Sequence, residues 1–251
     1  MSAVAIGIIT FACLFGGALL GMTLRNALPE HHLNDDSRHL LGMGLGIIGT
    51  MAGLVLGLLV ASATGAYNAQ RSEVLDVSSK VIMLDRILKH YGPEADPPRR
   101  ALRVAVQRTL SRIWPQENAG GPQLDPSAVG GEGLLDELED LSPKNDAQRS
   151  LKGEALGLAI DLGQIRWLMY EQSGSSLSVP LLVVLIFWFT ITFIGFGLFS
   201  PPNATVVVAL GLCSLAVSGA ILVTLEMYTP FQGLVQIPSA PLREALMHMG
   251  P

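Results

Sequence analysis

Four uninterrupted apolar stretches constrain this chain more than any other feature. They cover residues 4–24, 40–66, 179–199 and 204–225, and none contains Asp, Glu, Lys, Arg or His. A bilayer core about 30 Å thick needs roughly 20 apolar residues in a helix that rises about 1.5 Å per residue. Because each stretch has at least 21 residues, the sequence predicts an all-α integral membrane protein with four transmembrane helices.

Charged residues gather between the second and third apolar stretches, which divides the chain into parts. We predict transmembrane helices 1 and 2 in residues 1–66 and helices 3 and 4 in residues 178–227. A cytoplasmic helical domain, residues 67–177, is expected between helices 2 and 3, with a Gly/Pro/acidic loop at 115–143. Residues 228–251 are expected to form a cytoplasmic C-terminal tail.

The distribution of Lys and Arg near the membrane ends predicts the orientation. Five such residues lie beside the middle region and the tail: Arg71, Lys80, Arg86, Arg166 and Arg243. Only Arg25 and Arg38 lie on the other side. Since cytoplasmic segments carry the excess of positive charge, we expect both termini and the middle region in the cytoplasm.

Helical periodicity continues past the second apolar stretch. Apolar positions over residues 74–91 alternate at spacings of three and four, so the second helix is predicted to extend that far and to end at Gly92-Pro93. Pro97-Pro98 is expected to begin the next helix, and the same spacing predicts a third over residues 151–169. One short helical turn is expected near residues 134–141.

The turn between the third and fourth apolar stretches is too short for anything but an antiparallel helical hairpin. It reads Ser200-Pro201-Pro202-Asn203. Proline is expected to stop the first of these helices, and the side chain of Asn203 to cap the second.

The second apolar stretch contains a stripe of glycine. Its members share one helical face at spacings of three and four: Gly42, Gly46, Gly49, Gly53 and Gly57. Because glycine lets another helix approach closely, these residues are predicted to form a helix-packing seam, with Gly17 and Gly21 of the first stretch as its partner. A flexible gating hinge is the alternative.

An adjacent face of the same helix supplies candidate pore-lining residues, namely Ile47, Thr50, Leu54, Leu58 and Ser62. In an oligomer built around this helix they would form stacked rings, apolar rings that gate by dewetting and hydroxyl rings that replace lost water. The alternative is that they face lipid or a neighbouring helix. Asn68 and Arg71 follow at the expected cytoplasmic mouth, where a ring of arginines would attract anions, although positive-inside anchoring explains Arg71 equally well.

Other functional classes lack support in the sequence. No acid or histidine lies inside the apolar stretches, which argues against an ion-coupled transporter. No phosphate loop, nucleophile elbow or Cys-x-x-Cys pair occurs, so we expect no enzyme, no catalytic residue and no cofactor. The histidines and acids of the first loop and the acidic run at 136–140 fit solvated surfaces better than metal sites. No nucleic-acid-binding pattern is present.

Several segments resemble a family of prokaryotic membrane proteins described as bestrophin-like. The resemblance rests on residues 63–69 (Ala-Thr-Gly-Ala-Tyr-Asn-Ala), 84–94, 196–205 and 225–226, together with the Pro-Phe-Gln-Gly-Leu segment at 230–234. It spans nearly the whole chain and implies a bacterial inner (plasma) membrane location.

In layout the chain also resembles true bestrophins, which are pentameric anion channels whose second helix lines the pore. The resemblance implies a homo-oligomer, a pentamer by analogy, that conducts inorganic ions across the lipid bilayer. The aromatic neck of animal bestrophins has no match in residues 40–66, and no acidic calcium clasp follows the fourth helix, so neither calcium gating nor ion selectivity is carried over. The expected function is an ion channel, and the alternative is a non-conducting scaffold or sensor that acts through its cytoplasmic helices.

Overall fold

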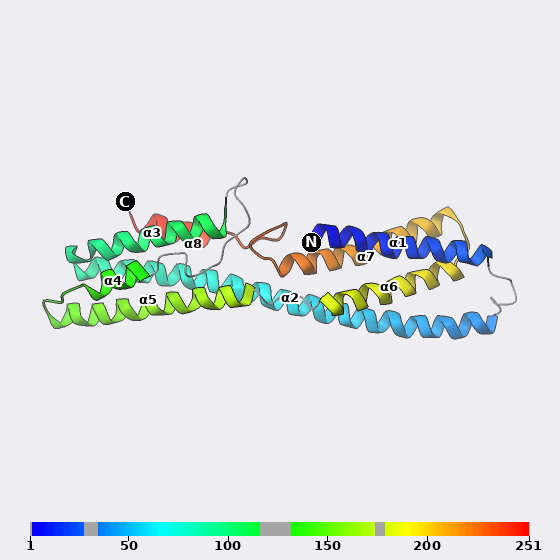
Figure 1. The fold of residues 1–251 in the computed structure, drawn as a ribbon, viewed down its shortest axis with the longest axis horizontal. Helices are drawn as coiled ribbons and strands as arrows, with labels where there is room; N and C mark the ends of the chain where they lie inside the picture. The colour runs from blue at the N-terminus through cyan, green and yellow to red at the C-terminus, as the bar shows by residue number, and fades with distance from the viewer. Residues whose placement is uncertain (1, 28–34, 116–131, 174–178, 251) are drawn as a thin grey trace. The chain divides into compact units, whose positions relative to one another are not determined.

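The structure is a computed structural model that describes residues 2–27, 35–115, 132–173 and 179–250, and every regular element in these ranges is helical (Figure 1). The elements are α1 (Ala3–Ala27), α2 (Asp35–Tyr91), the 3-10 turn η2 (Pro93–Ala95), α3 (Asp96–Ile113), α4 (Glu132–Glu139), α5 (Asp146–Ser173), α6 (Val179–Phe199), α7 (Ala204–Met227) and α8 (Ala240–His248). Unit 1 comprises residues 1–66 and 176–228, and unit 2 comprises residues 67–175 and 229–251. The expected all-helical class is confirmed.

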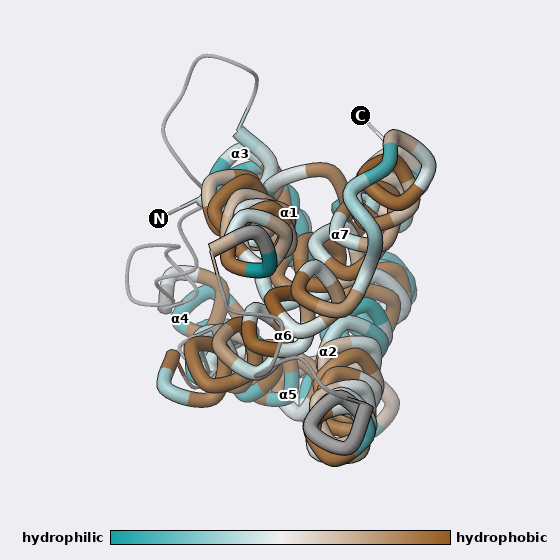
Figure 2. The backbone as a smooth tube through the Cα atoms, turned by 90° about the vertical axis from the view of Figure 1, so that its right-hand side faces the viewer, coloured by the Kyte–Doolittle hydropathy of each residue, from teal (hydrophilic) through white to brown (hydrophobic). Residues whose placement is uncertain are grey.

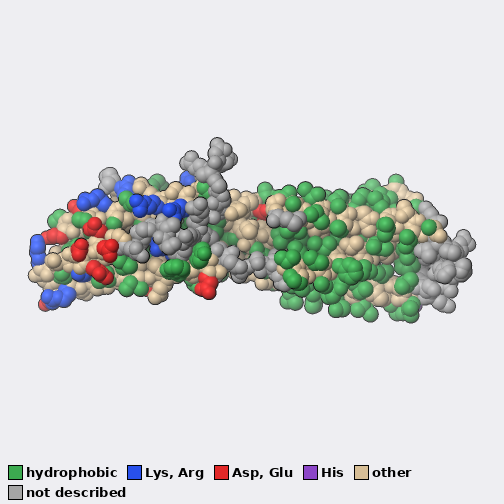
Figure 3. Space-filling model, in the orientation of Figure 1, with side chains coloured by type: hydrophobic (Ala, Val, Ile, Leu, Met, Phe, Trp, Pro, Cys, Tyr) green, Lys and Arg blue, Asp and Glu red, His purple; other side chains and the backbone are tan. Residues whose placement is uncertain are grey.

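Unit 1 holds four helices that are long and apolar enough to cross a membrane, namely α1, the first part of α2, α6 and α7. Hydrophobic side chains cover the visible face of unit 1, whereas Lys, Arg, Asp and Glu gather on unit 2 (Figure 3). Hydrophobic residues also recur along the backbone of α1 and α6 (Figure 2). Apolar side chains turned outward are suited to lipid, where no water is available for polar groups.

The hairpin between α6 and α7 forms as the sequence predicts. The side chain of Asn203 accepts a hydrogen bond from the backbone N–H of Val206 at 2.9 Å, which satisfies one of the free donors at the start of α7. The predicted cap is therefore confirmed. α1 packs along both helices of this hairpin, most extensively along α6.

Glycines bring the backbones of α1 and α6 into close contact. A Cβ added at Gly21 would overlap the carbonyl oxygen of Ile194, and one added at Gly197 would overlap the carbonyl oxygen of Ala18. At Gly17 an added Cβ would lie 3.2 Å from the Ile194 side chain. The prediction that Gly17 and Gly21 pack against the second helix is thus wrong within the chain, because their close neighbour is α6.

α2 is one continuous helix of 57 residues that runs from unit 1 into unit 2 and ends at Tyr91. Gly92 follows with φ 120°, in the left-handed region that favours glycine. Prolines occupy the first turns of both η2 and α3, where a missing N–H costs no hydrogen bond. The extension of the second helix to Tyr91 and its stop at Gly92-Pro93 are confirmed.

Unit 2 encloses its own hydrophobic core. Every helix of the unit contributes at least one buried side chain, for example Leu88 (α2), Leu102 (α3), Leu138 (α4), Ala155 (α5) and Leu242 (α8). The predicted helix that begins at Pro97-Pro98 corresponds to α3. The predicted helix over 151–169 corresponds to α5, and the short turn near 134–141 corresponds to α4. Helix α8 is not predicted from the sequence, where residues 228–251 are expected to form a tail.

Two groups of ion pairs tie the helices of unit 2 together. The side chain of Arg99 donates to the buried carboxylate of Asp85 on α2 at 2.9 Å and to the carbonyl oxygen of Met249, beyond α8, at 3.3 Å. Lys80 of α2 contacts Asp161 of α5 at 2.9 Å and Asp76 on its own helix at 3.6 Å. These contacts hold α3, α5 and the C-terminal segment against α2.

Candidate functional site

The first candidate site is the face of α2 in unit 1 that no other described helix covers. Ala52, Leu59 and Ala63 are buried and define the packed face. At about 100° per residue, Leu54 points about 160° away from Ala52. Leu54 is 66% exposed, and Ile47 and Leu58 are each 64% exposed. The helix therefore has a packed face and an open apolar face on opposite sides.

The two hydroxyl candidates differ in their surroundings. Thr50 is exposed, and its hydroxyl donates to the carbonyl oxygen of Gly46 at 2.8 Å, one turn back along the helix. The Oγ of Ser62 accepts a hydrogen bond from the hydroxyl of Tyr228, directly after α7, at 3.1 Å. Thus Ile47, Thr50, Leu54 and Leu58 share the open face, whereas Ser62 lies at its edge and contacts Tyr228.

Few of the described residues lie close to the glycine stripe. A Cβ added at Gly42, Gly46, Gly53 or Gly57 would meet no atom within 4 Å, and one added at Gly49 would meet only the Thr192 side chain, at 3.6 Å. The expected partners Gly17 and Gly21 pack on α6 instead, and the role of the stripe as a helix-packing seam stays a prediction.

The other predicted residues lie on exposed surfaces or outside the described ranges. Asn68 and Arg71 are exposed on the part of α2 that belongs to unit 2. The acidic run at 136–140 is exposed at each of its charged positions. Among the residues that the structure describes, no group of three or more His, Cys, Asp or Glu could hold a metal ion. His31 and His32 of the first loop lie outside those residues.

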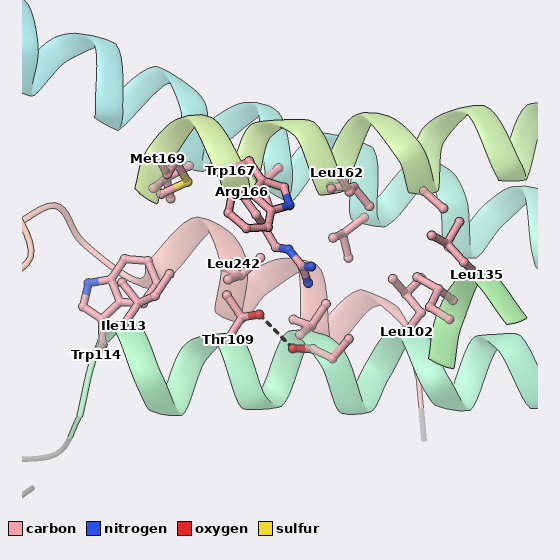
Figure 4. Close-up of a pocket in the computed structure, with 18 residues that line it drawn as sticks. Leu102, Thr109, Ile113, Trp114, Leu135, Leu162, Arg166, Trp167, Met169 and Leu242 are labelled. Carbon is pink, nitrogen blue, oxygen red and sulfur yellow. Dashed lines mark hydrogen bonds between the residues drawn. The ribbon is translucent and has the colours of Figure 1, made fainter. Parts of the chain in front are cut away.

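The second candidate site is an apolar cavity of about 310 Å³ inside unit 2. Side chains from α2, α3, α4, α5 and α8 line it, and most of them are aliphatic (Figure 4). Trp114 and Trp167 also line it. The indole N–H of Trp114 donates to the carbonyl oxygen of Ile237 at 2.8 Å, and the hydroxyl of Thr109 donates to the carbonyl oxygen of Ala105 at 2.9 Å. Both of these polar groups are thus engaged by backbone.

Arg166 of α5 is the charged residue in the cavity wall, and its side chain reaches into the space between α5 and α3 (Figure 4). Its Nε is buried and has no hydrogen-bond partner in the described part of the chain. Burial lowers the pKa of this guanidinium, because a low-dielectric environment disfavours the charged form. From the sequence, Arg166 is expected to mark the cytoplasmic side of the membrane, and no cavity is predicted around it. One feature of the sequence indicates that Arg166 lies near the core of unit 2: it directly follows Ile165, which belongs to the apolar face of this helix.

The four apolar helices and the lipid-suited surface of unit 1 define the class: the protein is an all-α membrane protein. A bestrophin-like domain matches residues 12–242, which is most of the sequence. The chain belongs to the bestrophin-like family, and the predicted resemblance is confirmed. No curated protein and no solved structure matches the chain significantly.

Proposed function

We propose that the protein is a homo-oligomeric ion channel in which α2 lines an axial pore. The observation that carries the proposal is the open face of α2. There, four of the five stripe glycines have no described atom within 4 Å of an added Cβ, and they lie beside exposed apolar side chains. Of the four apolar helices, α2 is the least buried. In its most apolar 18-residue segment 11% is buried, against 39% in that of α6. Glycines on a membrane helix allow close helix association, so the stripe supports contact between α2 helices of neighbouring copies.

The proposed assembly follows the family. A ring of copies, five by analogy with bestrophins, would bring the open faces of α2 together around one axis. We place the protein in the bacterial inner membrane with both termini and unit 2 in the cytoplasm, on the five-to-two bias of Lys and Arg. No catalytic activity is assigned to the chain, in keeping with the enzyme motifs that its sequence lacks.

The proposed pore has an apolar gate and a polar mouth. Rings of Leu54 and Leu58 would form a constriction that closes by losing water, and Thr50 would supply a ring of hydroxyls. Asn68 and Arg71 would stand at the cytoplasmic mouth, where positive charge concentrates anions. The apolar stretches contain no titratable acid or histidine, which supports passive conduction over ion-coupled transport.

The test is ion flux in liposomes together with the mass of the assembly in detergent. Leu54→Ser is expected to raise basal flux, because a hydroxyl lowers the cost of wetting the constriction. Leu212→Ser is the matched control, since Leu212 lies on α7 and is 62% exposed. An increase with Leu54→Ser alone supports the pore. Flux at the protein-free background for the wild type and both variants, or a monomer in detergent, would contradict the channel.

A second candidate function is a membrane sensor that conducts nothing and acts through unit 2. The cavity inside unit 2 favours this alternative, because its volume lies at the lower end of the range of small-molecule sites, about 300–1,000 Å³. A protein that binds a ligand there but stays at background flux would be a sensor.

A further inference from the structure

The cavity of unit 2 combines an apolar wall with one partly buried arginine, Arg166, whose Nε has no hydrogen-bond partner among the described residues. Leu102, Leu162 and Leu242 present aliphatic surface from three different helices. The polar groups of Thr109 and Trp114 are already bonded to backbone, so they are not free to bind a ligand strongly. Arg166 is the remaining charged group, and no carboxylate lines the cavity among the described residues.

Arg166 is partly buried, and a guanidinium whose buried Nε has no hydrogen-bond partner is energetically unfavourable. Buried charges in proteins are normally paired and hydrogen-bonded, because removal from water is costly. No ion pair of Arg166 is present in the described part of the chain. An anion that enters the cavity would supply the ion pair and hydrogen bonds that Arg166 lacks among the described residues. The planar guanidinium suits the two oxygens of a carboxylate.

The size of the cavity limits the apolar part of such a ligand. At about 30 Å³ for each water-sized group, a volume of about 310 Å³ accommodates on the order of ten non-hydrogen atoms. A phospholipid with two acyl chains is too large for this space. A phosphate head group would also carry more negative charge and more acceptor oxygens than one arginine satisfies.

We propose that this cavity binds a single-chain aliphatic carboxylate, with its tail among the leucines and valines and its carboxylate on Arg166. The site is separate from the open face of α2, so it goes beyond the proposed channel. Ligand binding in this cavity can be confirmed or refuted whether or not the protein conducts ions.

Octanoate is the probe, because it has eight carbons and one carboxylate and dissolves in water. The full chain in lipid nanodiscs is titrated with octanoate, and the fluorescence of Trp114 and Trp167, which line the cavity, reports binding. 1-Octanol supplies the tail without the charge, and protein-free nanodiscs correct for partition into lipid. Saturable binding of octanoate about tenfold or more tighter than that of octanol is expected, because a charge-assisted hydrogen bond contributes at least this factor.

Variants separate the roles of charge and cavity. Arg166→Gln should weaken octanoate about tenfold or more and leave octanol unchanged, whereas Arg86→Gln, at an exposed arginine of the same unit, should change neither. Gly163→Leu should abolish binding of both, because Gly163 lines the cavity and an added Cβ there meets nothing within 4 Å. Far-UV circular dichroism checks that each variant is folded.

Two results with the wild-type protein would overturn the proposal without any variant that might lose its fold. One is the absence of saturable octanoate binding to the wild type, and the other is equal affinity for octanoate and octanol. Unchanged octanoate binding in folded Arg166→Gln would also overturn it, and a lower melting temperature of that variant without ligand would then assign Arg166 a structural role.

Discussion

Gly197→Ala is the most direct perturbation of the helix contacts in unit 1. The added Cβ would overlap the carbonyl oxygen of Ala18 and would lie 2.9 Å from its carbonyl carbon and 3.0 Å from the backbone nitrogen of Met22. Backbone atoms of α1 cannot rotate away as a flexible side chain can. Because ordinary contact begins at 3.4 Å, relief of the carbonyl-carbon contact alone requires a shift of 0.5 Å, the difference between 3.4 and 2.9 Å. The carbonyl oxygen of Ala18 lies closer still, so α1 and α6 must separate by more than 0.5 Å.

The cost follows from the packing that this separation loosens. A gap of about 0.5–1 Å removes a quarter to a half of the dispersion energy of each atom pair, and a buried leucine-sized side chain makes about 40–60 pairs of about 0.1–0.2 kcal/mol. Met22 and Phe193 are buried in the cluster around this crossing. Inside a membrane, packing is a main source of helix association, because lipid tails are as apolar as leucine. We expect a loss of about 2–3 kcal/mol, consistent with overpacked cores.

The assay is thermal unfolding of the purified protein in detergent. A loss of about 2–3 kcal/mol lowers the melting temperature of a chain of this length by about 4–12 °C. Gly219→Ala in α7 is the matched control, since an added Cβ there meets nothing within 4 Å. If Gly197→Ala and Gly219→Ala both melt within about 1 °C of the wild type, the close approach of α1 to α6 is refuted.

Three further predictions test assembly, unit 2 and orientation. Gly53→Leu should leave the melting temperature of the single chain unchanged, because an added Cβ there meets nothing within 4 Å. The same substitution should weaken the oligomer, as measured by native mass spectrometry. An intact oligomer would exclude contact between copies at this glycine. Asp85→Asn should lower the free energy of unfolding by about 1–3 kcal/mol, because it breaks the ion pair with Arg99, in which the Asp85 side chain is 9% exposed. Asp76→Asn, where the side chain is 52% exposed, should lower it by less than about 0.5 kcal/mol. Equal denaturant midpoints for the two variants would contradict this difference. Reporters fused after Tyr91 and at the C-terminus should both report cytoplasm, and one inserted at residue 34 the outside; the reverse pattern would invert the proposed topology.

The sequence by itself determined the class of the protein and the positions of most helices. Length and apolarity identify the membrane helices because each must satisfy its own backbone hydrogen bonds and expose apolar side chains. Helix ends were equally local. Gly92-Pro93 stops α2 and Asn203 caps α7, since both signals act within one or two turns of the chain.

Beyond the hairpin of α6 and α7, the tertiary structure alone decided which helices are neighbours. Gly17 and Gly21 were expected to face the glycines of α2, but they contact α6. Apolar residues surround α1 and α6 on all sides, so no polar face marks the side that packs. The choice of partner then depends on how two surfaces fit in three dimensions, which the spacing of glycines in one helix does not encode.

The same reason explains α8 and the cavity of unit 2. Leu242 and Ala245 are buried only because α8 returns to the core that α2, α3 and α5 form. Arg166 becomes a cavity residue because five helices converge around it from distant parts of the sequence. Local sequence patterns specify which face of a helix is apolar, whereas a cavity and its buried charge arise from the space that several such faces leave between them.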